Sequence, residues 1–151
     1  ENEWSQANLA ALAEKQGIDG ERLIFAPRVA PADYLARYTA ADLFLDAYPF
    51  NAGTTANDAL WMGLPVLTRS GRTFASRMAG GLLTSLGMPE LITDTLTEYE
   101  ERAVELAVRK ADYQEMRAKL ARQRETSPLF DMENFVKDFG DAVSEVAVRS
   151  V

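Results

Sequence analysis

Phe50-Asn-Ala-Gly-Thr-Thr-Ala-Asn-Asp-Ala-Leu-Trp61 is the most informative segment of the chain. It follows the apolar run Leu43-Phe-Leu-Asp46 and precedes Gly63-Leu-Pro-Val-Leu-Thr68. An apolar strand, a turn of small residues, two hydroxyl side chains at a helix start and a second buried strand are typical of a phosphate-binding βαβ unit. The segment therefore predicts a ligand site as well as a fold.

Composition narrows the chemistry that this site can perform. The chain has 151 residues, of which 47% are hydrophobic and 26% charged, and this predicts a single soluble domain over residues 1–151. It contains no cysteine and no histidine, which excludes a disulfide framework and a thiolate metal site and removes the most common metal ligand and general base. We therefore expect no metal, and any proton transfer must use carboxylates, tyrosine, lysine or groups outside the chain.

Charge and hydropathy predict the kind of partner and the location. The net charge of -7 argues against nucleic acid as a partner, because that affinity comes from a basic surface that neutralises phosphates. No run approaches the roughly 20 apolar residues of a membrane span, and the first residues lack a secretory leader, so we expect a cytoplasmic protein without membrane contact. The start at Glu1-Asn-Glu-Trp4, without an initiator Met, suggests a domain excised from a longer protein.

Helical and strand patterns alternate in residues 1–95. Apolar spacing and start and stop residues predict helices at 3–16, 31–38, 54–62 and 73–86, and strands at 23–26, 43–47, 65–68 and 91–93. Such alternation predicts an α/β fold, a parallel Rossmann-like sheet with helices on both faces. Trp61 is expected in the core.

Residues 96–151 have a different character. An apolar helical stripe from Tyr99 to Leu120 predicts two amphipathic helices, or one with a break near Lys110, and a final helix follows Asp131. We expect these helices to form a C-terminal helical part that covers the sheet.

The predicted site lies at the start of the 54–62 helix. Thr54 and Thr55 follow a strand, so their hydroxyls and the free amides of a helix start can bind a diphosphate that approaches closely over Gly53. Asp58 lies one turn further on, where its carboxylate can accept both hydroxyls of a ribose. The alternative is purely structural, because threonine is an ordinary N-cap and aspartate is favoured in a first turn without any ligand.

Arginines follow the same strand ends. In an acidic chain they favour anion binding, although scattered surface arginines are also common. Tyr34 and Tyr48 can stack on a base or lie at the edge of the core. The arginines are Arg28, Arg37, Arg69, Arg72 and Arg77.

These residues resemble the C-terminal catalytic half of the O-GlcNAc transferase and SPINDLY family, in particular its bacterial members linked to tetratricopeptide repeats. The resemblance covers nearly the whole chain. It is carried by Arg22-Leu-Ile-Phe-Ala-Pro-Arg28, Leu35-Ala-Arg37, Ala41-Asp-Leu-Phe-Leu-Asp46, the segment from Thr54 to Thr68, Phe74-Ala-Ser-Arg77 and Ser127-Pro-Leu-Phe130.

The resemblance implies the C-terminal lobe of a two-lobed (GT-B type) glycosyltransferase that uses UDP-GlcNAc or a related nucleotide sugar, with no other cofactor, to modify protein serine or threonine hydroxyls. By position, Thr54 and Thr55 would hold the diphosphate and Asp58 the ribose. Arg37 and the backbone near Ala30 would hold the base. The implied partners are an acceptor protein, the N-terminal catalytic lobe and tetratricopeptide repeats.

Three departures from the family pattern limit what the chain is expected to do alone. Tyr34 and Gly53 stand where many relatives have histidines, so Tyr34 would pack on the base and Gly53 would contact phosphate through its backbone only. The family lysine that neutralises the leaving diphosphate has no counterpart here, so no catalytic residue is assigned. We expect weak donor binding and no sugar transfer by the isolated chain, and self-association through an exposed sheet edge or the final helix. A noncatalytic interaction module, or another nucleotide-phosphate-binding domain, are the alternative interpretations.

Overall fold

The computed structural model describes residues 2–149 and divides the chain into two compact units, Glu1–Tyr34 and Leu35–Val151. The first unit contains helix α1 (Glu3–Lys15) and the 3₁₀ turn η1 (Gly20–Arg22). The Asn2 side chain caps α1 by accepting a hydrogen bond from the Trp4 amide. Helix α2 (Pro31–Arg37) begins in this unit with proline at its first position, where no backbone donor is needed.

The predicted strand at 23–26 is wrong. In the described part of the chain these residues belong to no helix or strand, and Ile24 is 91% exposed. A strand needs a neighbour to satisfy its backbone N–H and C=O groups, and no described strand pairs with this segment. An apolar run alone therefore did not suffice to form a strand.

The second unit is built on a three-stranded parallel sheet, in the order β1 (Phe44–Leu45), β2 (Val66–Arg69) and β3 (Ile92–Thr93). Phe44 pairs with Val66, and Thr68 pairs with Ile92. The sheet confirms the predicted parallel α/β arrangement, with strands shorter than expected and with helices as the larger part of the fold.

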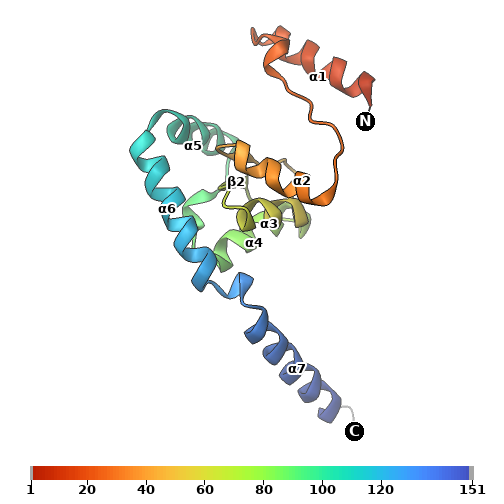
Figure 1. Ribbon diagram of the computed structural model, residues 1–151, viewed down its shortest axis with the longest axis vertical. Helices are drawn as coiled ribbons and strands as arrows, with labels where there is room; N and C mark the ends of the chain where they lie inside the picture. The colour runs from red at the N-terminus through yellow and green to blue at the C-terminus, as the bar shows by residue number, and fades with distance from the viewer. Residues whose placement is uncertain (1, 150–151) are drawn as a thin grey trace. The chain divides into compact units, whose positions relative to one another are not determined.

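Helices connect and cover these strands. Helices α3, α4 and α5 all contact β2, and α6 contacts both α5 and α3 (Figure 1). The helical elements of this unit are η2 (Tyr38–Ala40), α3 (Thr54–Trp61), η3 (Ala75–Arg77), α4 (Met78–Ser85), η4 (Pro89–Leu91), α5 (Leu96–Val108), α6 (Lys110–Thr126), η5 (Pro128–Phe130) and α7 (Met132–Arg149).

Two helix boundaries have clear local causes. A capping box starts α5, because Thr95 accepts from the Glu98 amide and the Glu98 carboxylate accepts from the Thr95 amide. The break predicted near Lys110 is confirmed and falls at Arg109, which has non-helical backbone angles and forms an ion pair with Glu105 at 2.8 Å.

The core lies between β2 and the surrounding helices. Its buried apolar residues are Ala56, Ala59, Leu60, Leu64, Val66, Leu67, Ala79, Leu83, Leu86, Met88, Leu91, Leu106, Met116 and Leu120. Trp61 is not among them, contrary to prediction, and is 50% exposed. Because it lies one residue beyond the inward-facing Leu60, its ring turns about 100° away from the core. It packs edge-on against Phe130 at the surface instead.

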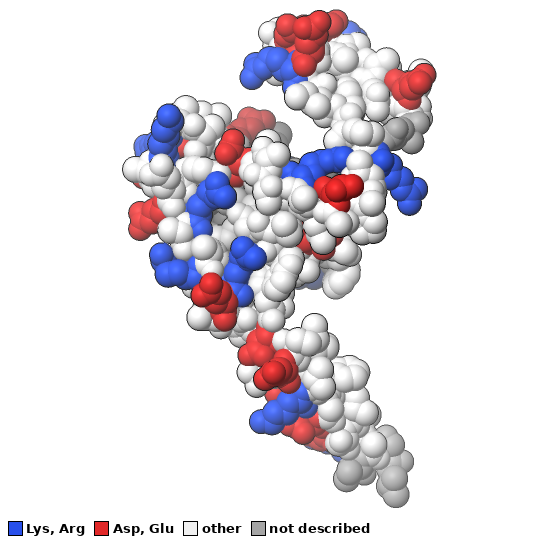
Figure 2. Space-filling model, in the orientation of Figure 1, with Lys and Arg blue, Asp and Glu red and all other residues white. Residues whose placement is uncertain are grey.

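Helix α7 follows η5 and carries an exposed apolar face. Phe135 and Phe139 stack with ring centroids 6.0 Å apart, although both are about 60% exposed. Charged side chains of both signs lie along this helix (Figure 2). Glu145 pairs with Arg149 at 2.6 Å. Self-association through this helix stays a prediction. None of the described helices has both the length and the hydropathy that a membrane crossing requires.

Candidate functional site

Thr54 and Thr55 occupy the first two positions of α3, at the end of the loop that leaves β1. The N-cap residue is Gly53, and no side chain caps the helix. Both threonines are exposed, and neither hydroxyl forms a hydrogen bond with any residue that the structure describes. Capping therefore does not explain this pair of threonines, and their hydroxyls are available to a ligand.

Backbone donors lie at the same helix start. The first backbone hydrogen bond of α3 is donated by the Asn57 N–H to the Gly53 carbonyl at 3.0 Å. The preceding amides, those of Thr54, Thr55 and Ala56, have no acceptor within residues 2–149. Free amides and the positive end of the helix dipole make such a turn an anion site. Two hydroxyls and three amides thus lie at one helix start.

A buried aspartate holds the loop that carries these donors. Asp46 directly follows β1 and is only 6% exposed. One of its carboxylate oxygens accepts from the Ala52 amide at 2.8 Å, and the other accepts from the Thr68 hydroxyl on β2 at 2.7 Å. Asp46 therefore ties both ends of residues 46–52 to the sheet and fixes where α3 begins.

Asn51 forms a second anchor for the same loop. Its side chain is fully buried, and the side-chain NH₂ group donates to the backbone carbonyls of Ala47 at 2.8 Å and Arg69 at 3.3 Å. The backbone N–H of Asn51 donates to the Ala75 carbonyl. These bonds join the loop after β1 to the end of β2 and to η3. The sequence did not predict that Asp46 and Asn51 anchor this loop. An acidic residue that ends an apolar run, followed by asparagine in the next turn, was the available signal.

Tyr99 on α5 completes this anchoring by donating its hydroxyl proton to the Asp46 carbonyl at 3.1 Å. Burial first, and the charge of Asp46 second, raise the pKa of Tyr99 above 10.0. The folded state thus holds this proton more tightly than the unfolded chain, so the associated stability is complete below pH 10.0 and is lost as pH rises through the folded pKa.

We expect Tyr99→Phe to lower the unfolding free energy by about 1 kcal/mol at pH 7 through the lost hydrogen bond. The variant should also lose less stability than the parent chain above pH 10.0. Urea unfolding between pH 7 and pH 11 measures both effects. An equally steep alkaline loss in parent and variant would contradict the assignment to Tyr99.

The structure brings Gly53, Thr54, Thr55 and Asp58 together on α3. Asp58 lies one turn beyond the threonines and is partly buried. Tyr38 donates its hydroxyl to the Thr55 carbonyl at 3.3 Å, which joins η2 to the first turn of α3.

The residues predicted to hold the base come from the α2 region. Ala30 and Tyr34 belong to the first unit, where the Tyr34 amide donates to the Ala30 carbonyl at 2.9 Å and so forms the first turn of α2. Arg37 ends α2, belongs to the second unit and is partly buried.

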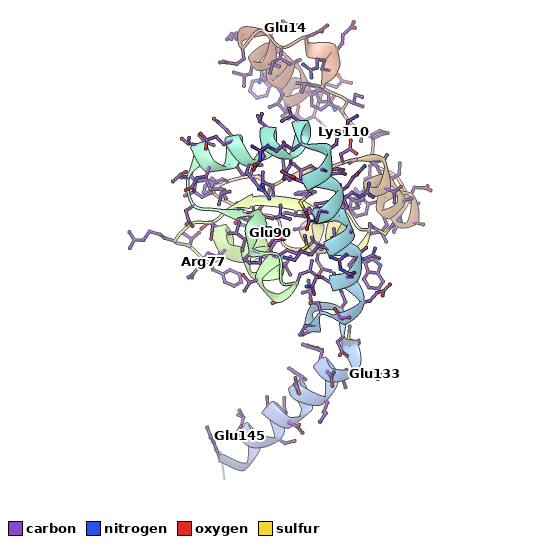
Figure 3. The ribbon with its side chains drawn as sticks, turned by 90° about the vertical axis from the view of Figure 1, so that its left-hand side faces the viewer. Glu14, Arg77, Glu90, Lys110, Glu133 and Glu145 are labelled. Carbon is purple, nitrogen blue, oxygen red and sulfur yellow. The ribbon has the colours of Figure 1, made fainter. Side chains whose placement is uncertain are left out.

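A pocket of about 610 Å³ opens beside the helix start, between α3 and α4. Gly53, Thr54 and Asn57 form one wall, and the exposed Phe74 stands at its edge. Figure 3 shows Arg77, which also lines the pocket, extending outward.

Position 53 shares its space with Met78. A Cβ atom at Gly53 would collide with the Met78 methyl group, the movable end of a flexible side chain. The absence of a side chain at position 53 therefore leaves the room that Met78 fills.

Candidate metal ligands do not cluster in the described part of the chain. Within residues 2–149, no three or more Asp and Glu side chains are grouped closely enough to hold a metal ion. The arrangement instead provides neutral and partly positive donors, a carboxylate one turn away and an adjoining pocket. These groups suit an anionic ligand that also carries hydroxyls.

Comparison with known proteins shows similarity to sugar transferases. Residues 3–139 match the model of glycosyl transferase family 41. The chain is 36% identical over 127 residues to a probable UDP-N-acetylglucosamine–peptide N-acetylglucosaminyltransferase SEC of Arabidopsis thaliana, covering 83% of this chain and 13% of that protein. It is 35% identical over 135 residues to the corresponding enzyme of Caenorhabditis elegans, covering 89% and 12%.

A solved structure shares the fold. A mutant of the O-GlcNAc transferase of Thermobaculum terrenum superposes with a TM-score of 0.85 at 30% identity, covering 94% of this chain and 27% of that one. The chain thus spans about an eighth of the length of the plant and nematode relatives, and about a quarter of the bacterial one.

Proposed function

The chain belongs to glycosyl transferase family 41, and we propose that it is the nucleotide-sugar-binding part of a transferase that moves GlcNAc from UDP-GlcNAc to serine or threonine hydroxyls of proteins. The start of α3 is the observation that carries this proposal, because its threonine hydroxyls and first-turn amides have no acceptor within residues 2–149. The names of the plant and nematode relatives supply the choice of UDP-GlcNAc and of a peptide acceptor.

Each group has a role that follows from its chemistry. The hydroxyls of Thr54 and Thr55 and the amides behind Gly53 would bind the diphosphate, and the Asp58 carboxylate would accept the ribose hydroxyls. Arg37, the backbone at Ala30 and Tyr34 would contact the base.

Transfer breaks the bond between the sugar and the diphosphate, so negative charge grows on the departing phosphate. Fixed amide donors stabilise such charge without having to reorient.

The rest of the machinery would come from outside these 151 residues. We propose an N-terminal catalytic lobe, with tetratricopeptide repeats, that supplies the acceptor site and the cation for the leaving group. The whole protein would act in the cytoplasm without a metal or other cofactor. The isolated chain is then expected to transfer no sugar, and measurable turnover by it would contradict this division of roles.

Replacement of Asp58 tests the proposed ribose contact. We expect Asp58→Ala to weaken UDP binding about 10- to 100-fold, because it removes hydrogen bonds to a charged acceptor. Isothermal titration of the 151-residue chain with UDP measures the change, and Asp141→Ala, which removes one exposed carboxylate from α7, is the charge-matched control. Equal affinity in the parent and Asp58→Ala would contradict the assignment.

Titration with GDP, and with the sugar derivatives of UDP and of GDP, separates the alternative functions. Preference for UDP supports the proposed donor. Binding of none of these nucleotides at millimolar concentration would instead favour a noncatalytic interaction module. Gly53 supports this alternative, because glycine offers no side-chain donor to the phosphates.

A further inference from the structure

A second pocket lies at the carboxyl end of β2, apart from the proposed donor site. Its volume is about 460 Å³, and it shares no residue with the set proposed above for the nucleotide sugar. It is formed where the loop after β1 faces the loop after β2. Tyr48, Pro49, Arg69, Ser70, Gly71, Arg72, Thr73, Ser76 and Asp94 line it.

Arg69 is held in this pocket with unused hydrogen-bonding capacity. It is the last residue of β2, and its guanidinium lies 4.0 Å from the centre of the Tyr48 ring, a close cation–π contact. Its Nε is buried and has no acceptor, and no carboxylate within residues 2–149 forms an ion pair with it. A guanidinium whose charge no described carboxylate balances favours a ligand that brings negatively charged oxygen atoms.

Arg72 supplies a second cation at the mouth of the same pocket. It is exposed and, within the described part of the chain, makes no ion pair. The pocket lining therefore carries two guanidinium groups and one carboxylate, that of Asp94, in a chain whose net charge is -7. The pocket is locally cationic on an acidic protein, which is the pattern expected of an anion site.

The loop between the two arginines is fixed before any ligand arrives. A Cβ atom at Gly71 would lie 2.5 Å from the Ser76 hydroxyl oxygen and 3.1 Å from the Tyr48 ring, so only glycine fits without a shift. The Thr73 amide donates to the Ser76 hydroxyl oxygen at 3.1 Å, and that hydroxyl donates to the Thr73 carbonyl at 3.0 Å. A fixed loop lowers the entropy lost on binding.

We propose that this pocket binds a phosphate-type oxyanion, with Arg69 and Arg72 as its charged donors. Arginine pairs with such groups through parallel N–H donors, and the Ser70 hydroxyl adds a neutral donor at the pocket wall. The oxyanion is either free phosphate or a phosphoryl group on a serine of a partner protein, since both present the same oxygens. The inference does not rest on the donor site at α3.

Titration of the full 151-residue chain with inorganic phosphate, followed by amide ¹H–¹⁵N NMR at constant ionic strength, tests the proposal. We expect saturable shifts at residues 69–73, with half-saturation about tenfold weaker in Arg72→Gln. Arg69→Lys, which keeps the charge but loses the planar donors, should also bind more weakly. Lys137→Gln on α7 removes the same charge elsewhere and should bind like the parent chain.

Two further titrations identify the source of the phosphate and distinguish this site from the donor site. A phosphoserine pentapeptide that binds more tightly than inorganic phosphate indicates a modified partner, and equal binding indicates the free ion. UDP reports separately through the amides of Thr54 and Thr55, so failure of one site leaves the other measurable. Absence of phosphate shifts at residues 69–73, or equal affinity in Arg72→Gln and the parent, would overturn the proposal.

Discussion

Replacement of Asp46 by alanine is expected to lower the unfolding free energy by about 3 kcal/mol, because hydrogen bonds to a charged acceptor are lost and their buried donors remain. The Ala52 amide and the Thr68 hydroxyl both donate to this carboxylate, which is only 6% exposed. Urea unfolding at pH 7 measures the loss.

Two further variants separate the contribution of Asp46 from that of charge alone. Asp141→Ala removes one exposed carboxylate and should change stability by less than about 0.5 kcal/mol. Combining Asp46→Ala with Thr68→Val forms a double-mutant cycle, in which we expect a favourable coupling energy. Additive effects, together with unchanged hydrogen exchange at the Ala52 amide, would show that Asp46 does not anchor the loop.

The Leu67→Ala substitution is expected to destabilise the chain by about 3 to 4 kcal/mol, since it removes a fully buried side chain and leaves a cavity. Leu67 lies in β2, the central strand, which α3, α4 and α5 all contact. Neighbours held by three helices and two strands cannot easily close the space. Chemical denaturation with urea gives the value directly.

The sheet itself offers the matched control. Leu45 pairs with Leu67 across β1 and β2 but is 57% exposed, so Leu45→Ala should cost less than about 1 kcal/mol. Both substitutions remove the same atoms from paired strand positions. Similar costs for the two would mean that β2 is not the centre of the core.

Local sequence was sufficient for elements whose neighbours are close in the chain. The run at 43–46, the two threonines and the run at 65–68 correctly predicted β1, α3 and β2, because each carries its own periodicity and boundary residues. The apolar run at 23–26 has the same appearance but forms no strand, since pairing depends on a partner that periodicity cannot supply. The predicted burial of Trp61 was wrong for a similar reason, because a large ring at a helix end can pack against a neighbour on the surface.

The elements that carry the candidate site could be predicted in part. The position of Thr54, Thr55 and Asp58 on one helix follows from spacing alone. The anchoring by Asp46 and Asn51 does not, because it depends on carbonyl and hydroxyl groups of β2 that are some 18 to 22 residues distant in sequence. The pocket at Arg69 and Arg72 likewise required the loop after β1 to be placed opposite the loop after β2.

The strand order has a consequence for how the chain folds. Each strand pairs with its neighbour in sequence, so Phe44 meets Val66 across 22 residues and Thr68 meets Ile92 across 24. Closing loops of this length costs little more entropy than closing a loop of half the length, about 0.6 kcal/mol for each doubling. The sheet can therefore assemble strand by strand from β1 to β3, in the order in which a ribosome would release it.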